Sequence, residues 1–245
     1  MKVWDPAETR KKFNLCLSED EKQTLRAKLG EPADDGHIYA DAVFEGGGVK
    51  GTAFIGALKC FDDVGIKWRK LAGTSAGAIT ASILATQRPM DELEAIISEL
   101  DYNTFLTQKN RFIFNGNPED DLQNPVWMGL NLILARQKGQ YSSEPFFEWL
   151  TQVLGEDIQT FQPFIETDPD LPWYQKRDLR IVVSDISRKE MVVLPTDLQD
   201  TIRYYPGEAA ELEIRYKKNF LVADAVRLSM SIPLFFEPGE LWRNQ

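Results

Sequence analysis

The fold is decided by residues 38–77, which read IYADAVFEGGGVKGTAFIGALKCFDDVGIKWRKLAGTSAG. Residues 38–44 form a short apolar run that predicts a buried strand. The glycines at positions 46–48 end this run, because glycine is unfavourable in strands and common in turns. Residues 52–61 follow with apolar side chains at helical spacing, which predicts an amphipathic helix.

A second strand and a second sharp turn complete this unit. Gly65 ends the first helix, and the apolar residues within 66–71 predict the next strand. Gly73-Thr74-Ser75-Ala76-Gly77 then forms a turn into a helix of small residues over 78–86. The order strand, helix, strand, helix with glycine-rich turns predicts an α/β fold with a parallel sheet.

The rest of the chain adds helices and a later pair of strands. A turn at Ser187-Arg188-Lys189 separates these strands, and Pro233 ends the last helix. The remaining expected elements are helices over 91–100, 126–135, 143–155 and 222–230, a polar loop over 108–123, and strands over 179–184 and 191–194.

The first 36 residues are a charged extension ahead of this unit. Ser18-Glu19-Asp20-Glu21 fits a capping box, in which the Ser and Glu side chains satisfy free N–H groups at the start of a helix. Gly30 marks the end of that helix. We therefore expect a helical extension over residues 1–36 and the main domain over residues 37–245.

The composition is that of a folded, acidic protein. Apolar residues make up 43% of the 245 residues, with 14 Phe and 6 Trp, which is enough for a sizeable core. The formal net charge is −10 and no dense basic run is present, which argues against a nucleic-acid-binding surface. With this charge, any contact with anionic membranes must rest on local apolar surface.

The numbers of cysteines and histidines and the lengths of the apolar segments indicate whether to expect a metal site, a signal peptide or a membrane span. Cys16 and Cys60 lie far apart and His37 is the single histidine, so we expect no metal site. The N-terminus lacks the apolar core of a signal peptide, and no window is long and apolar enough for a membrane span. We therefore expect a cytoplasmic protein.

The turn at 73–77 has the pattern G-x-S-x-G. A serine on a tight turn from a strand into a helix exposes its Oγ atom, and the glycines remove side chains that would clash there. The helix that follows directs free N–H groups toward the same place. Short glycine patterns also arise by chance in ordinary turns, but the position between a strand and a helix favours a nucleophile at Ser75.

The first glycine turn, 46–51, allows three interpretations. It matches the dinucleotide pattern G-x-G-x-x-G, but the end of the second strand lacks the acidic residue that holds a ribose. A phosphate-binding loop requires Gly-Lys-Ser/Thr, whereas Lys50-Gly51-Thr52 has the first two residues exchanged. The third interpretation is a turn that directs backbone N–H groups at an oxyanion. Because successive parallel strands end at one edge of the sheet, we expect both glycine turns to converge there.

The general base is constrained by the lack of a suitable histidine. A Ser-His-Asp hydrolase of the α/β type has its histidine after the serine, whereas His37 precedes the first strand. We expect His37 to be a surface loop residue. The base is then a carboxylate or a lysine, and Lys50 is more simply a solvated charge or an anion contact.

These motifs together resemble the patatin-like phospholipase family. A third stretch agrees, because residues 225–233 followed by Phe235-Phe236-Glu237-Pro238 are similar to the helix and turn that precede the family's catalytic aspartate. Ser184-Asp185-Ile186 and Val193-Leu194-Pro195 also resemble its mid-domain strands. The matching stretches span residues 42–238.

The resemblance implies a three-layer α/β fold with a mostly parallel central sheet. It also implies a Ser–Asp dyad that hydrolyses the acyl esters of phospholipids or other lipids without a cofactor. Carried over by motif, Ser75 is the nucleophile. The oxyanion hole is then formed by Gly46, Gly47, Gly48, Val49, Lys50 and Gly51, and the nucleophile elbow by Gly73, Thr74, Ala76 and Gly77.

The family's aspartate lies in an Asp-Gly sequence shortly after the Phe-Phe-Glu-Pro region, and residues 239–245 contain no aspartate. We therefore expect the sequence to stop before the dyad aspartate, with the fold incomplete at its C-terminal end. Three carboxylates are weak substitutes. Asp35 is more simply a turn residue, Asp185 a structural residue and Asp224 a charge at a helix N-terminus.

The sequence thus predicts a lipid acyl hydrolase that forms an acyl-enzyme on Ser75. Its partners would be a lipid or another acyl ester, with peripheral membrane contact and no nucleic acid. The alternative is a non-catalytic relative that binds lipid or a partner, because the dyad aspartate is missing from these residues. A nucleotide-binding domain that uses residues 46–51 is the weakest of the three.

Overall fold

The structure is a computed structural model of the 245-residue chain. It describes residues 5–105, 107–108, 139, 141–156, 158–200, 202–205, 212–214, 216–232 and 235–243. The predicted helix over 126–135 and nearly all of the predicted loop over 108–123 lie outside these residues.

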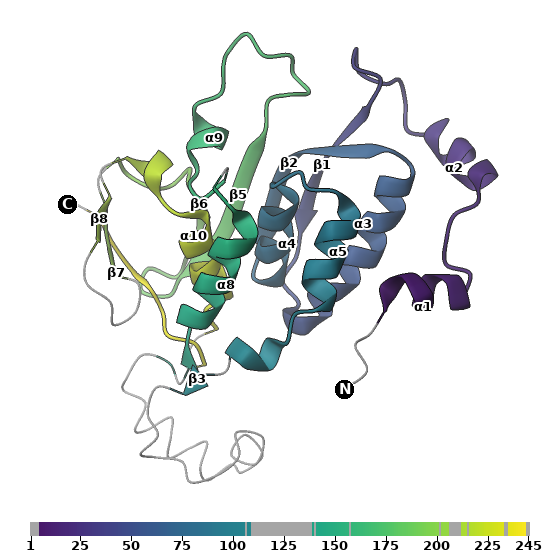
Figure 1. The fold of residues 1–245 in the computed structure, drawn as a ribbon. Helices are drawn as coiled ribbons and strands as arrows, with labels where there is room; N and C mark the ends of the chain where they lie inside the picture. The colour runs from purple at the N-terminus through teal and green to yellow at the C-terminus, as the bar shows by residue number, and fades with distance from the viewer. Residues whose placement is uncertain are drawn as a thin grey trace.

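The central sheet has four strands in the order β1-β2-β5-β6. The first three strands are parallel, and β6 is antiparallel to β5. This confirms the predicted α/β fold with a mostly parallel sheet (Figure 1). The strands are β1 Ile38–Phe44, β2 Ile66–Thr74, β5 Asp178–Asp185 and β6 Glu190–Leu194.

In the described part of the chain, the helices that cover this sheet pack on one of its faces. Two successive crossovers, from β1 to β2 and from β2 to β5, run in the same direction, and right-handed crossovers then place their helices on the same side. Helix α4 contacts β1 and β2, and α10 contacts β5. The five main helices are α3 Ala53–Asp63, α4 Ala76–Leu84, α5 Met90–Ser98, α8 Glu144–Leu154 and α10 Val222–Met230 (Figure 1).

Successive side chains along the strands alternate between the helix-covered face of the sheet and the opposite face. Leu71, Leu179 and Ile181 lie on the helix-covered face and are buried. On the other face, Val43 is 83% exposed and Met191 is 71% exposed. Residues 38–44 form the predicted strand, but the expected burial is wrong, because β1 is an edge strand that buries Phe44 alone.

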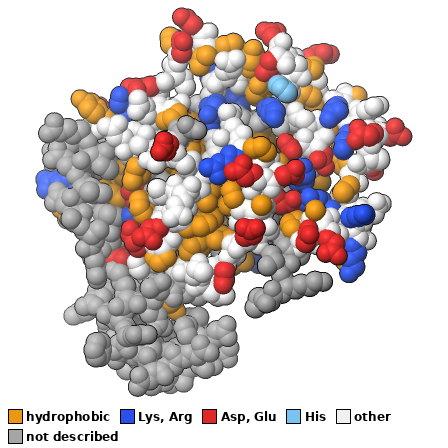
Figure 2. Space-filling model, viewed as in Figure 1, with side chains coloured by type: hydrophobic (Ala, Val, Ile, Leu, Met, Phe, Trp, Pro, Cys, Tyr) orange, Lys and Arg blue, Asp and Glu red, His pale blue; other side chains and the backbone are white. Residues whose placement is uncertain are grey.

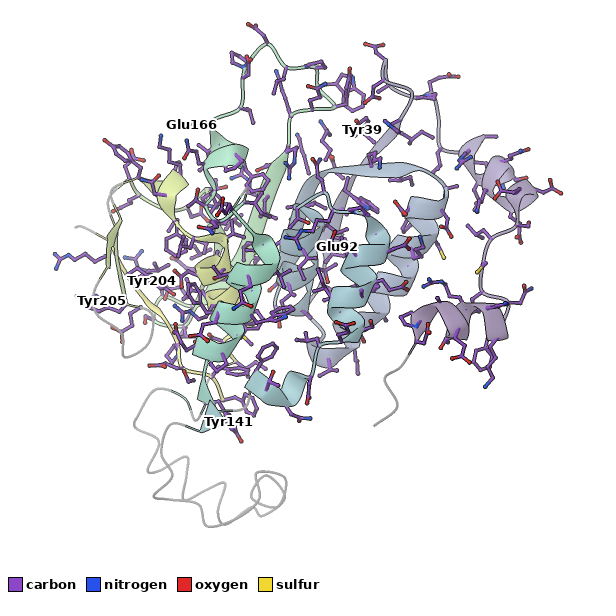
Figure 3. The ribbon with its side chains drawn as sticks, in the orientation of Figure 1. Tyr39, Glu92, Tyr141, Glu166, Tyr204 and Tyr205 are labelled. Atoms are coloured by element: carbon purple, nitrogen blue, oxygen red, sulfur yellow. The ribbon has the colours of Figure 1, made fainter. Side chains whose placement is uncertain are left out.

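A second, antiparallel sheet has the order β8-β7-β9, and sequence periodicity did not reveal it. It joins the main body where Tyr204 of β7 donates a hydrogen bond to Asp224 of α10, 2.9 Å away. Figure 3 shows Tyr204 next to this helix. The remaining short elements are β3 Thr107–Gln108, β4 Tyr141–Ser142, β7 Ile202–Tyr205, β8 Leu212–Ile214, β9 Glu240–Arg243, α9 Gln162–Ile165 and the 3-10 turns η1 Gly48–Thr52, η2 Tyr102–Phe105 and η3 Lys217–Asn219.

The N-terminal extension contains two helices, α1 Pro6–Lys12 and α2 Glu19–Arg26. The predicted capping box at the start of α2 is confirmed. The Ser18 hydroxyl accepts the Glu21 N–H, and the Glu21 carboxylate accepts the Ser18 N–H. Helix α2 also contacts the main body, since Arg26 donates to the Val64 carbonyl, 2.9 Å away.

The face of the molecule in Figure 2 carries no basic stripe. On the face in Figure 2, Lys and Arg side chains lie among Asp and Glu side chains. None of the helices in the described ranges is long and apolar enough to cross a membrane.

Candidate active site

Ser75 lies in the sharp turn between β2 and α4. Its backbone has φ 51° and ψ −122°, a combination that is uncommon for any residue other than glycine. Such strained residues persist where the surroundings hold them, and they cluster at active sites. The Ser75 side chain is partly exposed. The turn thus has the form that presents a serine hydroxyl at the end of a strand.

Two glycines make this turn sterically possible. A β-carbon at Gly73 would lie 2.1 Å from the Gly77 carbonyl oxygen, and one at Gly77 would lie 2.2 Å from the Phe44 carbonyl oxygen. Both contacts are with backbone atoms, which cannot rotate away. The two glycines of the G-x-S-x-G pattern are therefore required, because β1, β2 and α4 approach one another closely around Ser75.

The first glycine turn lies directly beside Ser75. A β-carbon at Gly46 would be 3.1 Å from the Ser75 β-carbon, and one at Gly51 would be 2.7 Å from the Ala76 β-carbon. Gly48 has a φ of 56°, in the left-handed region that favours glycine. The two glycine turns converge at one edge of the sheet, as the order of the strands predicted.

Backbone N–H groups from both turns are available at this edge. The first hydrogen bond of η1 runs from the Lys50 N–H to the Gly47 carbonyl, so the N–H groups of Gly48 and Val49 precede the hydrogen-bonded part of η1. Residues 46–50 are exposed. In α4, the Ala76 N–H precedes the first hydrogen bond of the helix, which runs from the Ala78 N–H to the Ser75 carbonyl.

Ser229 of α10 holds the backbone of Ser75 from the side. Its hydroxyl accepts the Ser75 N–H at 2.8 Å and donates to the Val182 carbonyl of β5 at 2.6 Å. No local sequence pattern indicates this contact, because the two serines are separated by 154 residues.

Asp35 and His37 lie at the opposite end of the sheet from Ser75. Both precede β1, whereas Ser75 follows the parallel strand β2. The Asp35 carboxylate accepts the Tyr39 hydroxyl at 2.6 Å and the His37 N–H at 3.1 Å. Figure 3 shows Tyr39 at this end of the sheet. Asp35 is a turn residue and His37 an exposed loop residue, as predicted.

The Asp185 carboxylate is hydrogen-bonded within its own turn. One carboxylate oxygen accepts the N–H groups of Ser187 and Arg188, each at 3.0 Å, which closes the turn between β5 and β6. This arrangement supports the structural role that the sequence predicted for Asp185.

Asp224 lies in a buried polar cluster with Arg227 and Tyr204, and the exposed Glu144 contacts this cluster from α8. The Asp224 carboxylate accepts from the Arg227 guanidinium at 2.5 Å, and Arg227 also contacts Glu144 of α8 at 2.9 Å. Burial raises the pKa of Asp224 despite the attraction of Arg227. Asp224 lies in the first turn of α10, as predicted, and its side chain also joins α10 to β7 through Tyr204.

Lys50 lies in η1 with its side chain exposed. A β-carbon placed on Gly47 would lie 3.8 Å from the Lys50 β-carbon. Within the described ranges, no three His, Cys, Asp or Glu side chains are grouped so that they could hold a metal ion.

The chain is similar to several known proteins. An uncharacterized protein of Bacillus subtilis (strain 168), YqhO, is 36% identical over 208 residues, which are 83% of this chain and 59% of YqhO. The chain therefore spans less than two thirds of the length of this relative.

Two solved structures of bacterial proteins show a weaker likeness. VipD from Legionella pneumophila has 17% identity and a TM-score of 0.46, with 85% of this chain and 46% of VipD covered. ExoU from Pseudomonas aeruginosa, solved in complex with SpcU, has 18% identity and a TM-score of 0.44, with 84% of this chain and 40% of ExoU covered.

The sequence model of the patatin-like phospholipase family matches residues 42–242, which include both glycine turns, Ser75 and α10. The match covers most of the chain and ends within β9. The chain therefore belongs to the patatin-like phospholipase family.

Proposed function

We propose that this protein is a lipid acyl hydrolase in which Ser75 is the nucleophile. The observation that carries the proposal is the backbone of Ser75, held at φ 51° in a turn where a second glycine turn comes within van der Waals contact. Membership of the patatin-like phospholipase family supports an acyl ester of a lipid as the substrate class.

The proposed reaction has two steps. A base takes the proton of the Ser75 hydroxyl as Oγ attacks the ester carbonyl carbon, and the carbonyl oxygen becomes an oxyanion. The oxyanion collapses, the bond to the alcohol oxygen breaks, and the alcohol or lysolipid leaves with a proton. Water then attacks the acyl-enzyme in the same way and releases the fatty acid. Neither step uses a metal or an organic cofactor.

The oxyanion is held by backbone N–H groups of the first glycine turn in this proposal. The donors come from residues 46–51, with the Gly48 and Val49 N–H groups exposed at the start of η1. Donors that are fixed before the reaction stabilise developing charge without reorganisation, and each is typically worth about 3 kcal/mol in the transition state. Gly73, Thr74, Ala76 and Gly77 form the elbow that brings Ser75 to these donors.

A second candidate function is a lipid- or partner-binding protein without catalysis. The observation that favours it is that the three carboxylates considered as bases all make other contacts. Asp35 lies at the far end of the sheet, Asp185 closes a turn, and Asp224 is paired with Arg227.

A fluorophosphonate probe tests the first candidate directly. An activated serine displaces fluoride from phosphorus, forms an O–P bond and passes its proton to the base, so labelling reports activation without requiring the natural substrate. We expect labelling of the wild-type protein, none of Ser75→Ala, and unchanged labelling of Ser184→Ala. Ser184 is a matched control, because it is an exposed serine near the end of the neighbouring strand β5.

The outcome also separates the two candidates. A folded wild-type protein that stays unlabelled, while it sediments with phospholipid vesicles, would support the binding function and reject the hydrolase. Labelling that persists in Ser75→Ala would reject Ser75 as the nucleophile.

A further inference from the structure

Ser229 occupies a place where the central sheet would otherwise continue. Thr74 at the end of β2 is in register with Val182 of the parallel strand β5. At the next position, the Ser229 hydroxyl accepts the Ser75 N–H and donates to the Val182 carbonyl. Both hydrogen-bonding functions of this hydroxyl are used, so its orientation is fixed. A side chain from α10 thus bridges the nucleophile turn to β5.

The hydrogen bonds of Ser229 restrain the backbone of Ser75. Ser75 has a positive φ, and its conformation persists only if neighbouring groups hold it. The Ser75 carbonyl accepts the Ala78 N–H at 2.9 Å, which fixes the helix side of the turn. The Ser229 hydroxyl fixes the amide on the strand side.

We propose that Ser229 is a positioning residue for Ser75. This inference rests on the proposed hydrolase function, and it adds a consequence for the oxyanion hole. Because the Ser75 N–H already donates to Ser229, it does not point at a substrate oxygen. The oxyanion donors therefore come from other N–H groups, those of the first glycine turn and of Ala76.

The position of Ser229 is itself fixed by the buried cluster on the same helix. Arg227 of α10 pairs with Asp224 and with Glu144 of α8, and Tyr204 of β7 donates to Asp224. Helix α10 is therefore held from two sides, within about one and a half turns of Ser229.

Substitutions that differ by one hydroxyl test the proposal. Ser229→Thr keeps the hydroxyl and Ser229→Val replaces it with a methyl group of similar size, so both variants carry the same added bulk. Ser231→Ala is the local control, because the Ser231 hydroxyl donates to the Arg227 and Glu237 carbonyls and not to Ser75.

Three quantities are measured for each variant: the second-order rate constant of fluorophosphonate labelling, the exchange rate of the Ser75 amide by NMR, and the urea midpoint. A small misplacement of a reacting group can lower a rate by about 100-fold. We expect labelling of Ser229→Val to be about 10- to 100-fold slower than wild type, with faster exchange of the Ser75 amide. Ser229→Thr should label within about threefold of wild type, and Ser231→Ala should retain wild-type labelling.

The possible outcomes are distinguishable. If wild type labels and the Thr and Val variants label equally, Ser229 does not position Ser75. If wild type does not label, the hydrolase proposal fails. The amide exchange then still decides whether the bridge restrains Ser75, since unchanged exchange in Ser229→Val would overturn it. A fall in the urea midpoint shared by the Thr and Val variants reports the added methyl group alone.

Discussion

Alanine in place of Gly77 would put a β-carbon 2.2 Å from the Phe44 carbonyl oxygen and 2.6 Å from that of Glu45. Both atoms belong to the backbone at the end of β1, so no side-chain rotation relieves the contact. Ordinary contact would require β1 and α4 to separate by about 1 Å. Such overpacking costs about 3 kcal/mol, the upper part of the usual range, because the two segments belong to the sheet and its main helix.

Urea unfolding followed by tryptophan fluorescence measures this cost. With an m-value of about 3 kcal/mol/M for a chain of this size, the midpoint should fall by about 1 M. Gly56→Ala is the matched control, because a β-carbon at Gly56 meets no atom within 4 Å and the residue lies inside α3. Alanine favours helix over glycine by about 0.5–1 kcal/mol, so this variant should be more stable than wild type.

The two substitutions thus have opposite predicted signs, although each adds one methyl group. Equal midpoints for Gly77→Ala and wild type would refute the close approach of β1 and α4. In that case the elbow would not be built as described, and the positive φ of Ser75 would lose its structural explanation.

Two further predictions concern polar groups away from Ser75. Arg227→Met leaves the Asp224 carboxylate buried with Tyr204 as its partner, and should cost about 3–5 kcal/mol in urea unfolding, whereas the double variant Asp224→Leu/Arg227→Met should recover part of this loss. Burial and the hydrogen bond to the Asp35 carboxylate raise the pKa of Tyr39 to about 12 from 10.0. The stabilisation that accompanies this shift is complete below pH 10 and is lost as the pH rises toward 12. Phenolate absorbance should therefore include a titration near pH 12 that disappears in Tyr39→Phe and moves to lower pH in Asp35→Asn. An unchanged pKa of Tyr39 in Asp35→Asn would contradict the role of Asp35.

The central sheet and the two glycine turns were predictable because their signals are local. Apolar runs of strand length, glycines that end them and apolar spacing between them define one strand–helix–strand unit within residues 38–77. Helix α10 was predicted from Val222 to Met230 because an apolar pattern precedes a proline, and the structure has these same bounds. The predicted convergence of the turns followed from parallel topology alone.

Other features depend on contacts between distant residues and left no local pattern. The second sheet uses strands of three and four residues, which are too short for periodicity to identify. The exposed face of β1 is the face of the sheet that the described helices do not cover. The contact between Ser75 and Ser229, and the pairing of Asp224 with Arg227 and Tyr204, became evident from the packing of α10 against the sheet.

The most direct test of the account is to trap the acyl-enzyme. The protein would be incubated with a short-chain ester or a phospholipid, quenched in acid, digested and examined by mass spectrometry, beside the Ser75→Ala and Ser184→Ala variants. We expect the peptide containing Ser75 to gain the mass of the acyl group in wild type and in Ser184→Ala, and ester hydrolysis to be lost in Ser75→Ala. Hydrolysis that continues in Ser75→Ala, or an acyl group on another residue, would contradict it.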